Sequence, residues 1–211
     1  MSDFRGFPVA ALDFYDDLEV DNTKSFWDVH RAVYDEQVKA PMVALTDALA
    51  QEFGDAKVFR PYRDVRFAKD KTPYKIHQGA FVGVAPATGY YVEVSAAGVR
   101  IGGGTYHAAG PELSLIREGM AEDRSGKVLE RIVRDLERGG FEIGGDQLKT
   151  SPRGYDKDHP RIELLRHKSL LGMKKYGFEP FVHTAELLDR VRKDWRTLRP
   201  LVGWMAEQLE R

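Results

Sequence analysis

Apolar residues in the first quarter of the chain recur at helical spacing. One stripe covers residues 9–18 and predicts a short amphipathic helix. A second stripe covers residues 26–53, with Asn22 as the predicted N-cap, because an asparagine side chain can accept a backbone N–H at a helix start. Pro41 is expected to kink or split this second helix, since proline lacks the N–H and crowds the preceding turn. Gly54 is the predicted stop.

The pattern changes to short runs of β-branched and aromatic residues between residues 58 and 101, separated by Gly and Pro. Residues 90–94 and 99–101 read as the two strands of a hairpin. Gly98 is expected to supply a positive φ in the turn between them. The middle of the chain is therefore predicted to form a sheet.

Helical periodicity returns at Gly110-Pro111, since proline suits a first helical position. Ser125 is the predicted cap of a further helix that ends at Gly139-Gly140. A strand is expected at residues 141–143, and a turn or two of helix at residues 162–165.

The C-terminal part is predicted to contain an edge strand at residues 170–173 and a long final helix. Thr184 is the expected cap of that helix, and Pro200 is expected to kink it. Trp195 and Trp204 fall on its apolar stripe and are predicted to lie in the core.

The order of the predicted elements defines the fold class. Strands lie in the middle, helices lie at both ends, and no regular alternation of strand and helix occurs. This order predicts an α+β protein with one domain over residues 1–211, in which a central, mostly antiparallel sheet is flanked by N- and C-terminal helices.

Composition narrows the possible classes of protein. The 211 residues include 32 Lys+Arg, 33 Asp+Glu and no cysteine, which excludes a uniformly basic protein, disulfide frameworks, cysteine nucleophiles and thiolate metal sites. No 18-residue apolar run occurs and no secretory signal is readable, so no membrane partner and a cytoplasmic location are predicted. The oligomeric state is not predicted.

The net charge of the whole chain is only -1, but the charges are unevenly distributed along it. Residues 57–75 contain seven Lys/Arg and two Asp, and residues 149–175 contain eight Lys/Arg and three Asp/Glu. Each block therefore has a net charge of +5, and the rest of the chain has a net charge of -11. These two basic blocks are where an anionic partner is expected to bind.

The first block is predicted to be extended, because Val65 and Phe67 alternate. Arg63 then shares their apolar face, where a guanidinium must meet a counter-ion or a ligand. The predicted ligand-binding residues are Arg60, Arg63, Arg66, Lys71 and Lys75, with Tyr74 as a hydroxyl donor. The alternative is a buried ion-pair network, in which Asp64 and Asp70 neutralise the arginines.

The first block also carries a long motif, Arg60-x-x-Arg63-Asp64-x-Arg66-Phe67-x-x-x-Lys71-x-Pro73-Tyr74. This motif resembles the defining motif of the DUF2461 family, a bacterial family of unknown function. The resemblance extends to the helix start at residues 22–34, the glycine-rich segment after the hairpin and residues 151–156. It implies a compact domain in a bacterial cytoplasm, and it implies no particular activity.

The second block contains a polar loop at residues 152–161. His159 and Asp156 are its predicted acid–base residues, and Arg153 is a predicted ligand-binding residue. For Asp158 the favoured interpretation is a cap of the following helix. The loop is only weakly metal-like, so no metal site is assigned, and no cofactor is indicated.

Two weaker candidates lie elsewhere in the sequence. Gly102-Gly103-Gly104 is interpreted as a bulge or strand exit, with an anion cradle of backbone N–H groups as the alternative. His30 and Tyr34 are interpreted as part of a polar helix face, with a pocket wall as the alternative.

Three hypotheses of function follow. The favoured one is a protein, possibly an enzyme, that binds a small anionic ligand bearing phosphate or carboxylate, with both basic blocks facing one cleft. The second is a nucleic-acid-binding module in which Tyr62 and Tyr74 stack on bases. The third is a non-catalytic scaffold whose arginines form structural ion pairs.

Overall fold

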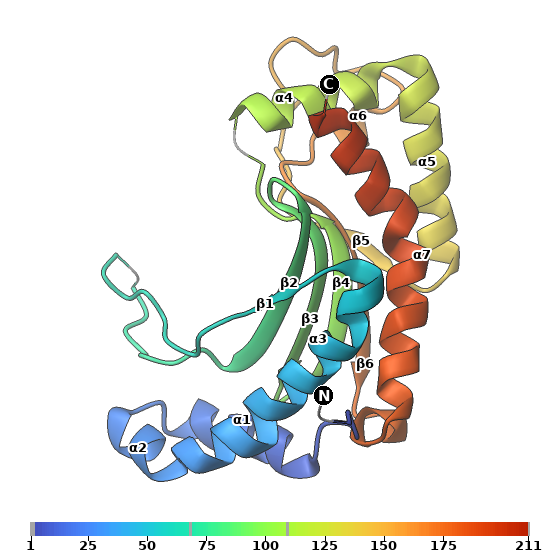
Figure 1. Cartoon of the computed structure of the whole chain (residues 1–211). Coiled ribbons are helices and arrows are strands. Elements are labelled where there is room, and N and C mark those ends of the chain that lie inside the picture. Colours follow the sequence, from blue (N-terminus) through green and yellow to red (C-terminus); the bar gives the residue numbers. More distant parts are fainter. Residues whose placement is uncertain (1–2, 68, 109, 211) are drawn as a thin grey trace. The chain divides into compact units, whose positions relative to one another are not determined.

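The computed structural model describes residues 3–67, 69–108 and 110–210 (Figure 1). Helices open and close the chain, and strands occupy its middle. The elements are α1 (Val9–Val20), α2 (Lys24–Val33), the π-helix η1 (Tyr34–Lys39), α3 (Ala40–Phe53), β1 (Ala56–Val58), β2 (His77–Ala85), β3 (Thr88–Ser95), β4 (Gly98–Thr105), α4 (Gly110–Ala121), α5 (Asp123–Arg138), β5 (Glu142–Gly144), α6 (Ile162–Leu165), β6 (Leu170–Gly177), the 3₁₀ helix η2 (Pro180–His183) and α7 (Glu186–Leu209).

The strands form a six-stranded sheet in the order β1-β2-β3-β4-β6-β5. β1 pairs antiparallel with β2, with Ala56 opposite Val82, and β5 pairs antiparallel with β6, with Glu142 opposite Met173. The predicted α+β class with an antiparallel sheet is confirmed. The predicted edge position of residues 170–173 is wrong, because β6 lies between β4 and β5.

The described chain divides into two compact units, and the strands run through both. The first unit comprises residues 1–82, 91–101 and 175–193, and the second comprises residues 83–90, 102–174 and 194–211. The single domain stays a prediction.

In the second unit, the C-terminal part of α7 packs on the sheet. Trp195 is fully buried, and its ring lies 5.3 Å from that of Tyr90 on β3. A Cβ added at Gly103 would lie 3.2 Å from Val202 and 3.4 Å from Leu198, so this glycine gives the helix close access to β4. The predicted core position of Trp195 is confirmed, and Trp204 is 4% exposed.

The glycine triplet therefore lies inside β4, and the anion-cradle alternative is wrong. A Cβ at Gly102 would lie 2.1 Å from the sulfur of Met173, and one at Gly104 would lie 2.2 Å from the carbonyl oxygen of Leu170. These glycines allow the neighbouring strand to approach, which is a structural role.

Several predicted helix caps shift by a few residues. Thr23 caps α2, because its Oγ1 accepts the backbone N–H of Phe26 at 3.2 Å, and Asn22 is used elsewhere. Glu122 caps α5 in place of Ser125, since its carboxylate accepts two backbone N–H groups of the first turn. The predicted stops at Gly54 and Gly139 are confirmed.

The helix predicted over residues 26–53 is divided into three segments, and Pro41 lies at one of the divisions, as the predicted split requires. The chain passes from α2 through the π-helix η1 into α3, and Pro41 lies in the first turn of α3. The N–H of Ala40 donates to the carbonyl of Asp35, five residues back, so the wider π-turn precedes the proline. By contrast, α7 continues through Pro200, and the kink expected there stays a prediction.

The hairpin between β3 and β4 depends on Gly98, as the sequence predicts. Gly98 has φ +90°, and a Cβ there would lie 1.9 Å from the carbonyl oxygen of Gly177. Both the backbone conformation and the close strand approach exclude a side chain at this position.

Replacing Gly98 with alanine is expected to destabilise the first unit severely. Gly140 is the matched control, since it has φ +80° but no atom within 4 Å of its added Cβ. We expect G140A to cost about 1 kcal/mol from backbone strain alone, and G98A to cost several-fold more or to prevent folding. Urea unfolding measures both, and equal losses for the two variants would contradict this steric account.

Candidate functional site

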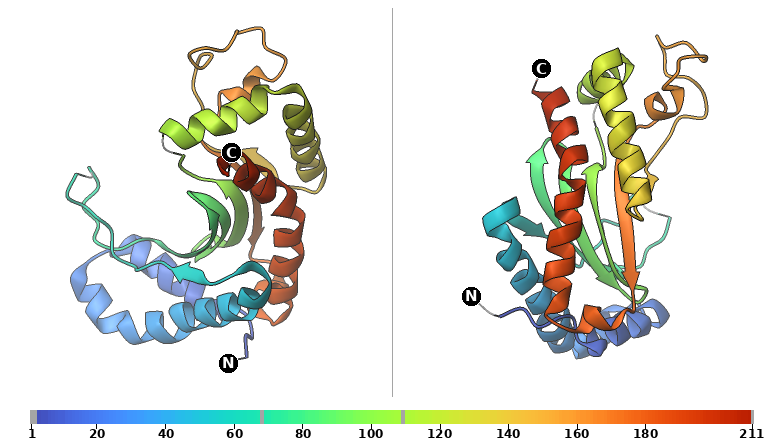
Figure 2. Two further views of the ribbon diagram at one scale, coloured as in Figure 1. Left: turned by 45° about the horizontal axis from the view of Figure 1, so that its top comes forward. Right: turned by 90° about the vertical axis from the view of Figure 1, so that its right-hand side faces the viewer.

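The first basic block forms a long irregular loop between β1 and β2, which we call the basic arm (residues 59–76; Figures 1 and 2). The two ends of the arm, residues 59–63 and 72–76, form its root, and they run antiparallel to each other. Tyr62 forms a β-bridge with Tyr74, the N–H of Arg63 donates to Pro73 at 2.9 Å, and the N–H of Lys75 donates to Pro61 at 2.7 Å. The block is therefore extended at its root, but it folds back on itself.

The root of the arm is fixed to the start of α2 by a side-chain clamp. The Asn22 amide donates to the carbonyl of Tyr74 at 3.0 Å and accepts its N–H at 3.1 Å. The ring of Tyr74 stacks on Trp27 with centroids 4.2 Å apart and planes 7° apart. Tyr74 is 4% exposed, and this burial raises the pKa of its hydroxyl. The buried Tyr74 ring therefore helps to hold the arm against α2.

The outer part of the arm is exposed, and its arginines pair locally. Arg63 donates to Asp70 and Thr72, and Arg66 donates to both carboxylate oxygens of Asp64, at 2.9 and 2.6 Å. Phe67 is 97% exposed, so the predicted apolar face shared by Arg63 and Phe67 is wrong. The expected partners Asp64 and Asp70 are present, but these are exposed ion pairs, which contribute little to stability.

The two lysines of the predicted site donate to carbonyls of the arm itself. Lys71 Nζ donates to Val65 at 2.8 Å, and Lys75 Nζ donates to Arg60 at 3.1 Å. Lys75 also lies 5.3 Å from the centroid of Phe59, and burial lowers the pKa of its ammonium. The side chain of Arg60 is exposed, with no hydrogen bond or ion pair among the residues that the structure describes.

The polar loop of the second block belongs to the second unit. Asp156 Oδ1 accepts the N–H of Asp158 at 2.9 Å, and His159 Nδ1 accepts the N–H of Arg161 at 3.0 Å. Arg161 is the N-cap residue of α6, so the predicted cap at Asp158 is wrong. Arg153 is exposed. These residues lie in a different unit from the basic arm, and the common cleft stays a prediction.

Arg161 is a buried structural arginine that the sequence did not single out. It is 4% exposed, and its guanidinium donates to the carbonyls of Met120 and Ala121 and to Asp123, at 2.7, 2.8 and 2.9 Å. It therefore closes the C-terminal end of α4.

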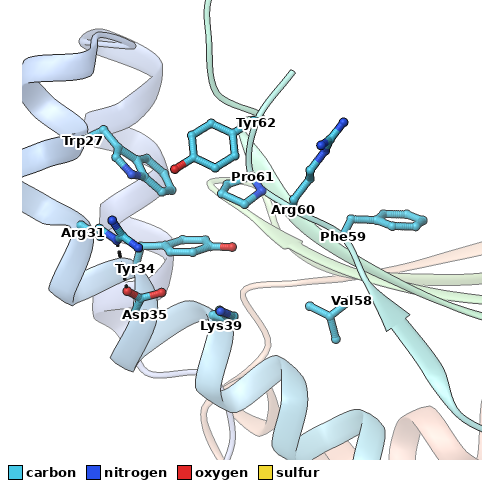
Figure 3. A pocket seen from close by; sticks show the side chains of 10 residues that line it. All are labelled: Trp27, Arg31, Tyr34, Asp35, Lys39, Val58, Phe59, Arg60, Pro61 and Tyr62. Carbon is cyan, nitrogen blue, oxygen red and sulfur yellow. Dashed lines mark ion pairs between the residues drawn. The ribbon is translucent and has the colours of Figure 1, made fainter. Parts of the chain in front are cut away.

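The first unit contains a cleft of about 330 Å³ between the α2–η1 helix and the root of the basic arm, which we call the aromatic cleft (Figure 3). Three basic side chains and one acidic side chain line it, together with aromatic and apolar groups. The lining residues are Trp27, Arg31, Tyr34, Asp35, Lys39, Val58, Phe59, Arg60, Pro61 and Tyr62.

The charged side chains leave the aromatic cleft with an excess of positive charge. Arg31 pairs with Asp35 at 3.6 Å. Lys39 and Arg60 have no side-chain hydrogen bond or ion pair in the described part of the chain. Figure 3 shows Lys39 on the helical side of the cleft, and Arg60 on the arm, with its guanidinium extended away from the indole of Trp27.

Trp27 carries an unusual feature of this cleft. Its side chain is 3% exposed, yet its indole Nε1–H has no hydrogen-bond partner among the described residues. By contrast, the indole of Trp204 donates to the carbonyl of Ser125 at 3.1 Å. A buried unpaired donor costs about 1–3 kcal/mol, so a partner for this N–H would stabilise the protein.

Tyr34 forms the rigid middle of the cleft. Its hydroxyl donates to Gln78 Oε1 at 2.6 Å, and Gln78 Nε2 in turn donates to the carbonyl of Phe59 at 2.7 Å. Burial, and then the nearby Asp35 carboxylate, raise the pKa of Tyr34, so it remains a protonated donor at neutral pH. This chain of hydrogen bonds joins the helical wall of the cleft to the wall formed by the arm.

Only part of this cleft is predictable from the sequence. Arg60 is among its predicted ligand-binding residues, and Tyr34 lines the cleft as the pocket-wall alternative proposed. His30 is used differently, since its ring stacks on Phe26 at 4.0 Å. Trp27 and Lys39 were not predicted. The spacing of Trp27, Arg31 and Tyr34 along one face of a predicted helix indicates Trp27, whereas no local pattern indicates Lys39.

Comparison with known proteins defines the family. A family model described as a conserved hypothetical protein (DUF2461) matches residues 10–204 of the chain. The chain therefore belongs to this family. No curated protein matches it.

The described residues contain neither a metal-binding cluster nor a membrane-spanning helix. No group of three or more His, Cys, Asp or Glu side chains is arranged to hold a metal ion. Within the same residues, no helix is both long and apolar enough to cross a bilayer.

The Asp70 carboxyl is expected to titrate far below the ordinary value of 3.8. The N–H of Thr72 and then the Arg63 guanidinium lower its pKa to about 2. Its stabilisation of the arm is therefore complete above the ordinary pKa and is lost as the pH falls through about 2. Carbon-13 NMR of the carboxyl groups measures this titration.

R63Q tests the cause of that shift. We expect the pKa of Asp70 to rise only part of the way, because the Thr72 N–H remains, while the pKa of Asp64, which pairs with Arg66, stays low. An Asp70 that titrates at its ordinary value in the unmodified protein would contradict the arrangement of the arm.

Proposed function

We propose that the aromatic cleft binds a small anionic ligand that also carries a flat, unsaturated ring. The observation that carries this proposal is the buried, unpartnered Nε1–H of Trp27, because such a donor is satisfied when a ligand oxygen or nitrogen accepts it. The excess positive charge of Lys39 and Arg60 favours an anion. The aromatic lining favours a ring.

Size and chemistry restrict the ligand further. A volume of about 330 Å³ is at the small end for ligand pockets, which suits a ring with a phosphate or carboxylate group. Lys39 and Arg60 are the proposed partners of the anionic group. The hydrogen bond from Tyr34 to Gln78 helps to fix the two walls relative to each other, so the cleft is formed before the ligand binds.

The cleft supports binding more directly than catalysis. Asp35, which pairs with Arg31, is its one acidic lining residue, and no histidine is among its lining residues. His159 and Asp156 remain predicted acid–base residues of the second unit. The other predicted ligand-binding residues, Arg63, Arg66, Lys71, Tyr74, Lys75 and Arg153, also remain predictions, as do the cytoplasmic location and the bacterial source.

One observation favours nucleic acid as a second candidate. The outer arm exposes Phe67 together with Arg66, Lys69 and Lys71, which is a combination that can stack on bases and contact phosphates. Arg66 is already paired with Asp64, however, and this pairing reduces the charge available to phosphates. We therefore place the small anionic ligand first.

Phenyl phosphate is a suitable probe, and the indole N–H signals in a ¹H–¹⁵N NMR spectrum are the readout. We expect saturable displacement of the Trp27 signal, with the Trp204 signal unchanged because its N–H is already bonded within the second unit. Phenol and inorganic phosphate, each carrying half of the probe's chemistry, are expected to bind at least tenfold more weakly.

Variants of Arg60 and Lys39, with an arginine of the outer arm as the control, locate the phosphate group of the bound probe. R60A and K39A are each expected to weaken phenyl phosphate binding about tenfold, which corresponds to about 1.4 kcal/mol. R66A is the control, since Arg66 is an exposed arginine of the same arm that does not line the cleft. If R66A weakens binding as much as R60A does, the binding surface is the outer arm and the cleft proposal is wrong.

A salt titration with single-stranded DNA separates the second candidate from the first. Nucleic-acid binding through the arm predicts an affinity that falls steeply with salt concentration and falls further in F67A and R66A. Binding confined to the cleft predicts a mild salt dependence for phenyl phosphate and no measurable affinity for DNA at physiological salt.

A further inference from the structure

The first unit contains a second cleft, of about 300 Å³, which shares no lining residue with the aromatic cleft. We call it the Glu93 cleft, after the buried carboxylate that lines it. Its other lining residues are Glu19, Ile76, His77, Ser95, Ala97, Gly98, Val99, Arg100 and Lys175.

Glu93 is a charged side chain that the fold buries. The residue is 4% exposed, and it lies on the same face of β3 as Tyr91, two positions before it. The Tyr91 hydroxyl donates to Glu93 Oε2. Burial, and then the nearby carboxylate, raise the pKa of Tyr91, which therefore remains a donor. Gly79 on β2 makes room for this phenol, because a Cβ there would lie 2.6 Å from its oxygen.

Arg100 on β4 meets the same carboxylate with two nitrogens. Its Nε lies 2.6 Å from Glu93 Oε1, and its Nη2 donates to Oε2 at 3.1 Å. The Arg100 side chain nevertheless remains 45% exposed. Glu93 therefore holds the Nε edge of the guanidinium, which also interacts with Tyr91, and the exposed part of the Arg100 side chain lines the cleft.

Two further polar groups complete the Glu93 cleft. His77 Nε2 on β2 lies 4.0 Å from Glu93 Oε2, and its side chain is 34% exposed. Burial lowers the pKa of His77 more than Glu93 raises it, so at neutral pH it offers hydrogen bonds rather than charge. Lys175 on β6 lines the cleft as well, whereas Ile76 and Val99 give it an apolar side.

We propose that the Glu93 cleft is a second small-molecule site, which binds the carboxylate of a short aliphatic acid on the exposed part of Arg100. Glu93 is a positioning residue in this proposal, because it acts on the ligand through Arg100. The two carboxylates and two cations of the lining nearly cancel, so a singly charged carboxylate is favoured over a doubly charged phosphate. The planar edge of a guanidinium also matches a carboxylate in geometry.

A buried ion pair is often no more stabilising than well-packed apolar residues of the same volume, because removing the charges from water costs free energy. In the Glu93–Arg100 pair only Glu93 is buried, whereas Arg100 is 45% exposed, so Arg100 spares the carboxylate from being an unpaired buried charge and still reaches the cleft. Because the pair lines the wall of a cleft, Arg100 is placed to contact a bound ligand.

The experiment uses butyrate as the probe and follows the Nε–H signal of Arg100 by NMR in the full chain. We expect saturable displacement of this signal by butyrate. Butylamine and inorganic phosphate at equal ionic strength are expected to give at most one tenth of the affinity. The Trp27 indole signal reports on the aromatic cleft and is expected to stay unchanged.

Variants separate recognition from structure. R100K keeps the charge but loses the planar fork, and it is expected to weaken butyrate binding at least tenfold. H77N, which leaves the Glu93–Arg100 pair intact, is expected to weaken it about threefold. R138K is the matched control, because Arg138 is an exposed arginine that pairs with Asp135 in the second unit, and no change is expected.

Two results would overturn the proposal. The first is the absence of any saturable shift with butyrate in a folded protein, since this would leave the Glu93–Arg100 pair a structural ion pair. The second is equal binding of phosphate and butyrate, because the site would then lack the selectivity that defines it. If R100K fails to fold, H77N and the unmodified chain still decide between these outcomes.

Discussion

The clamp between Asn22 and the backbone of Tyr74 is the interaction on which the candidate binding surface depends. It pairs one side-chain amide with both backbone groups of Tyr74, 52 residues further along the chain. The Trp27–Tyr74 stack lies beside it. Together they hold the root of the basic arm against the start of α2. Without them, the arm would be joined to the helical wall only through the Trp27–Tyr62 contact and the Tyr34–Gln78–Phe59 hydrogen bonds among the described interactions, and the aromatic cleft would be less firmly shaped.

The same anchor explains why some basic residues of the arm pair within the arm and others lie at the cleft. Near the root, the clamp leaves the Arg60 side chain at the cleft, whereas Lys75 donates to the carbonyl of Arg60. Farther out, Arg63 and Arg66 meet Asp70 and Asp64 within the arm itself. A basic block that looked uniform in sequence therefore contains structural and available cations. The available cations are where recognition of an anion is expected.

The sequence predicted the α+β class well, because hydrophobic spacing and glycine positions such as Gly54 and Gly98 act locally. It failed where distant residues decide the outcome. Phe67 and Val65 alternate as in a strand, but no sheet covers the arm, so Phe67 is exposed. Asn22 has the side chain of an N-cap, yet its partner is Tyr74, which no local pattern reveals.

The candidate sites show the same limit. Arg60 and Tyr34 could be proposed from charge and helical spacing. The Glu93 cleft could not be found in this way, because it needs β2, β3 and β4 side by side to bring His77, Glu93 and Arg100 together. Their sequence separation gives no motif. The pairing of strands creates the cluster.

A crystal structure of the chain with phenyl phosphate tests the central claim most directly. The account predicts the probe in the aromatic cleft, with an acceptor atom about 3 Å from Trp27 Nε1 and its phosphate oxygens near Lys39 and Arg60. The account would be contradicted by an empty cleft in which the indole N–H donates to a protein group while the probe lies elsewhere on the basic arm.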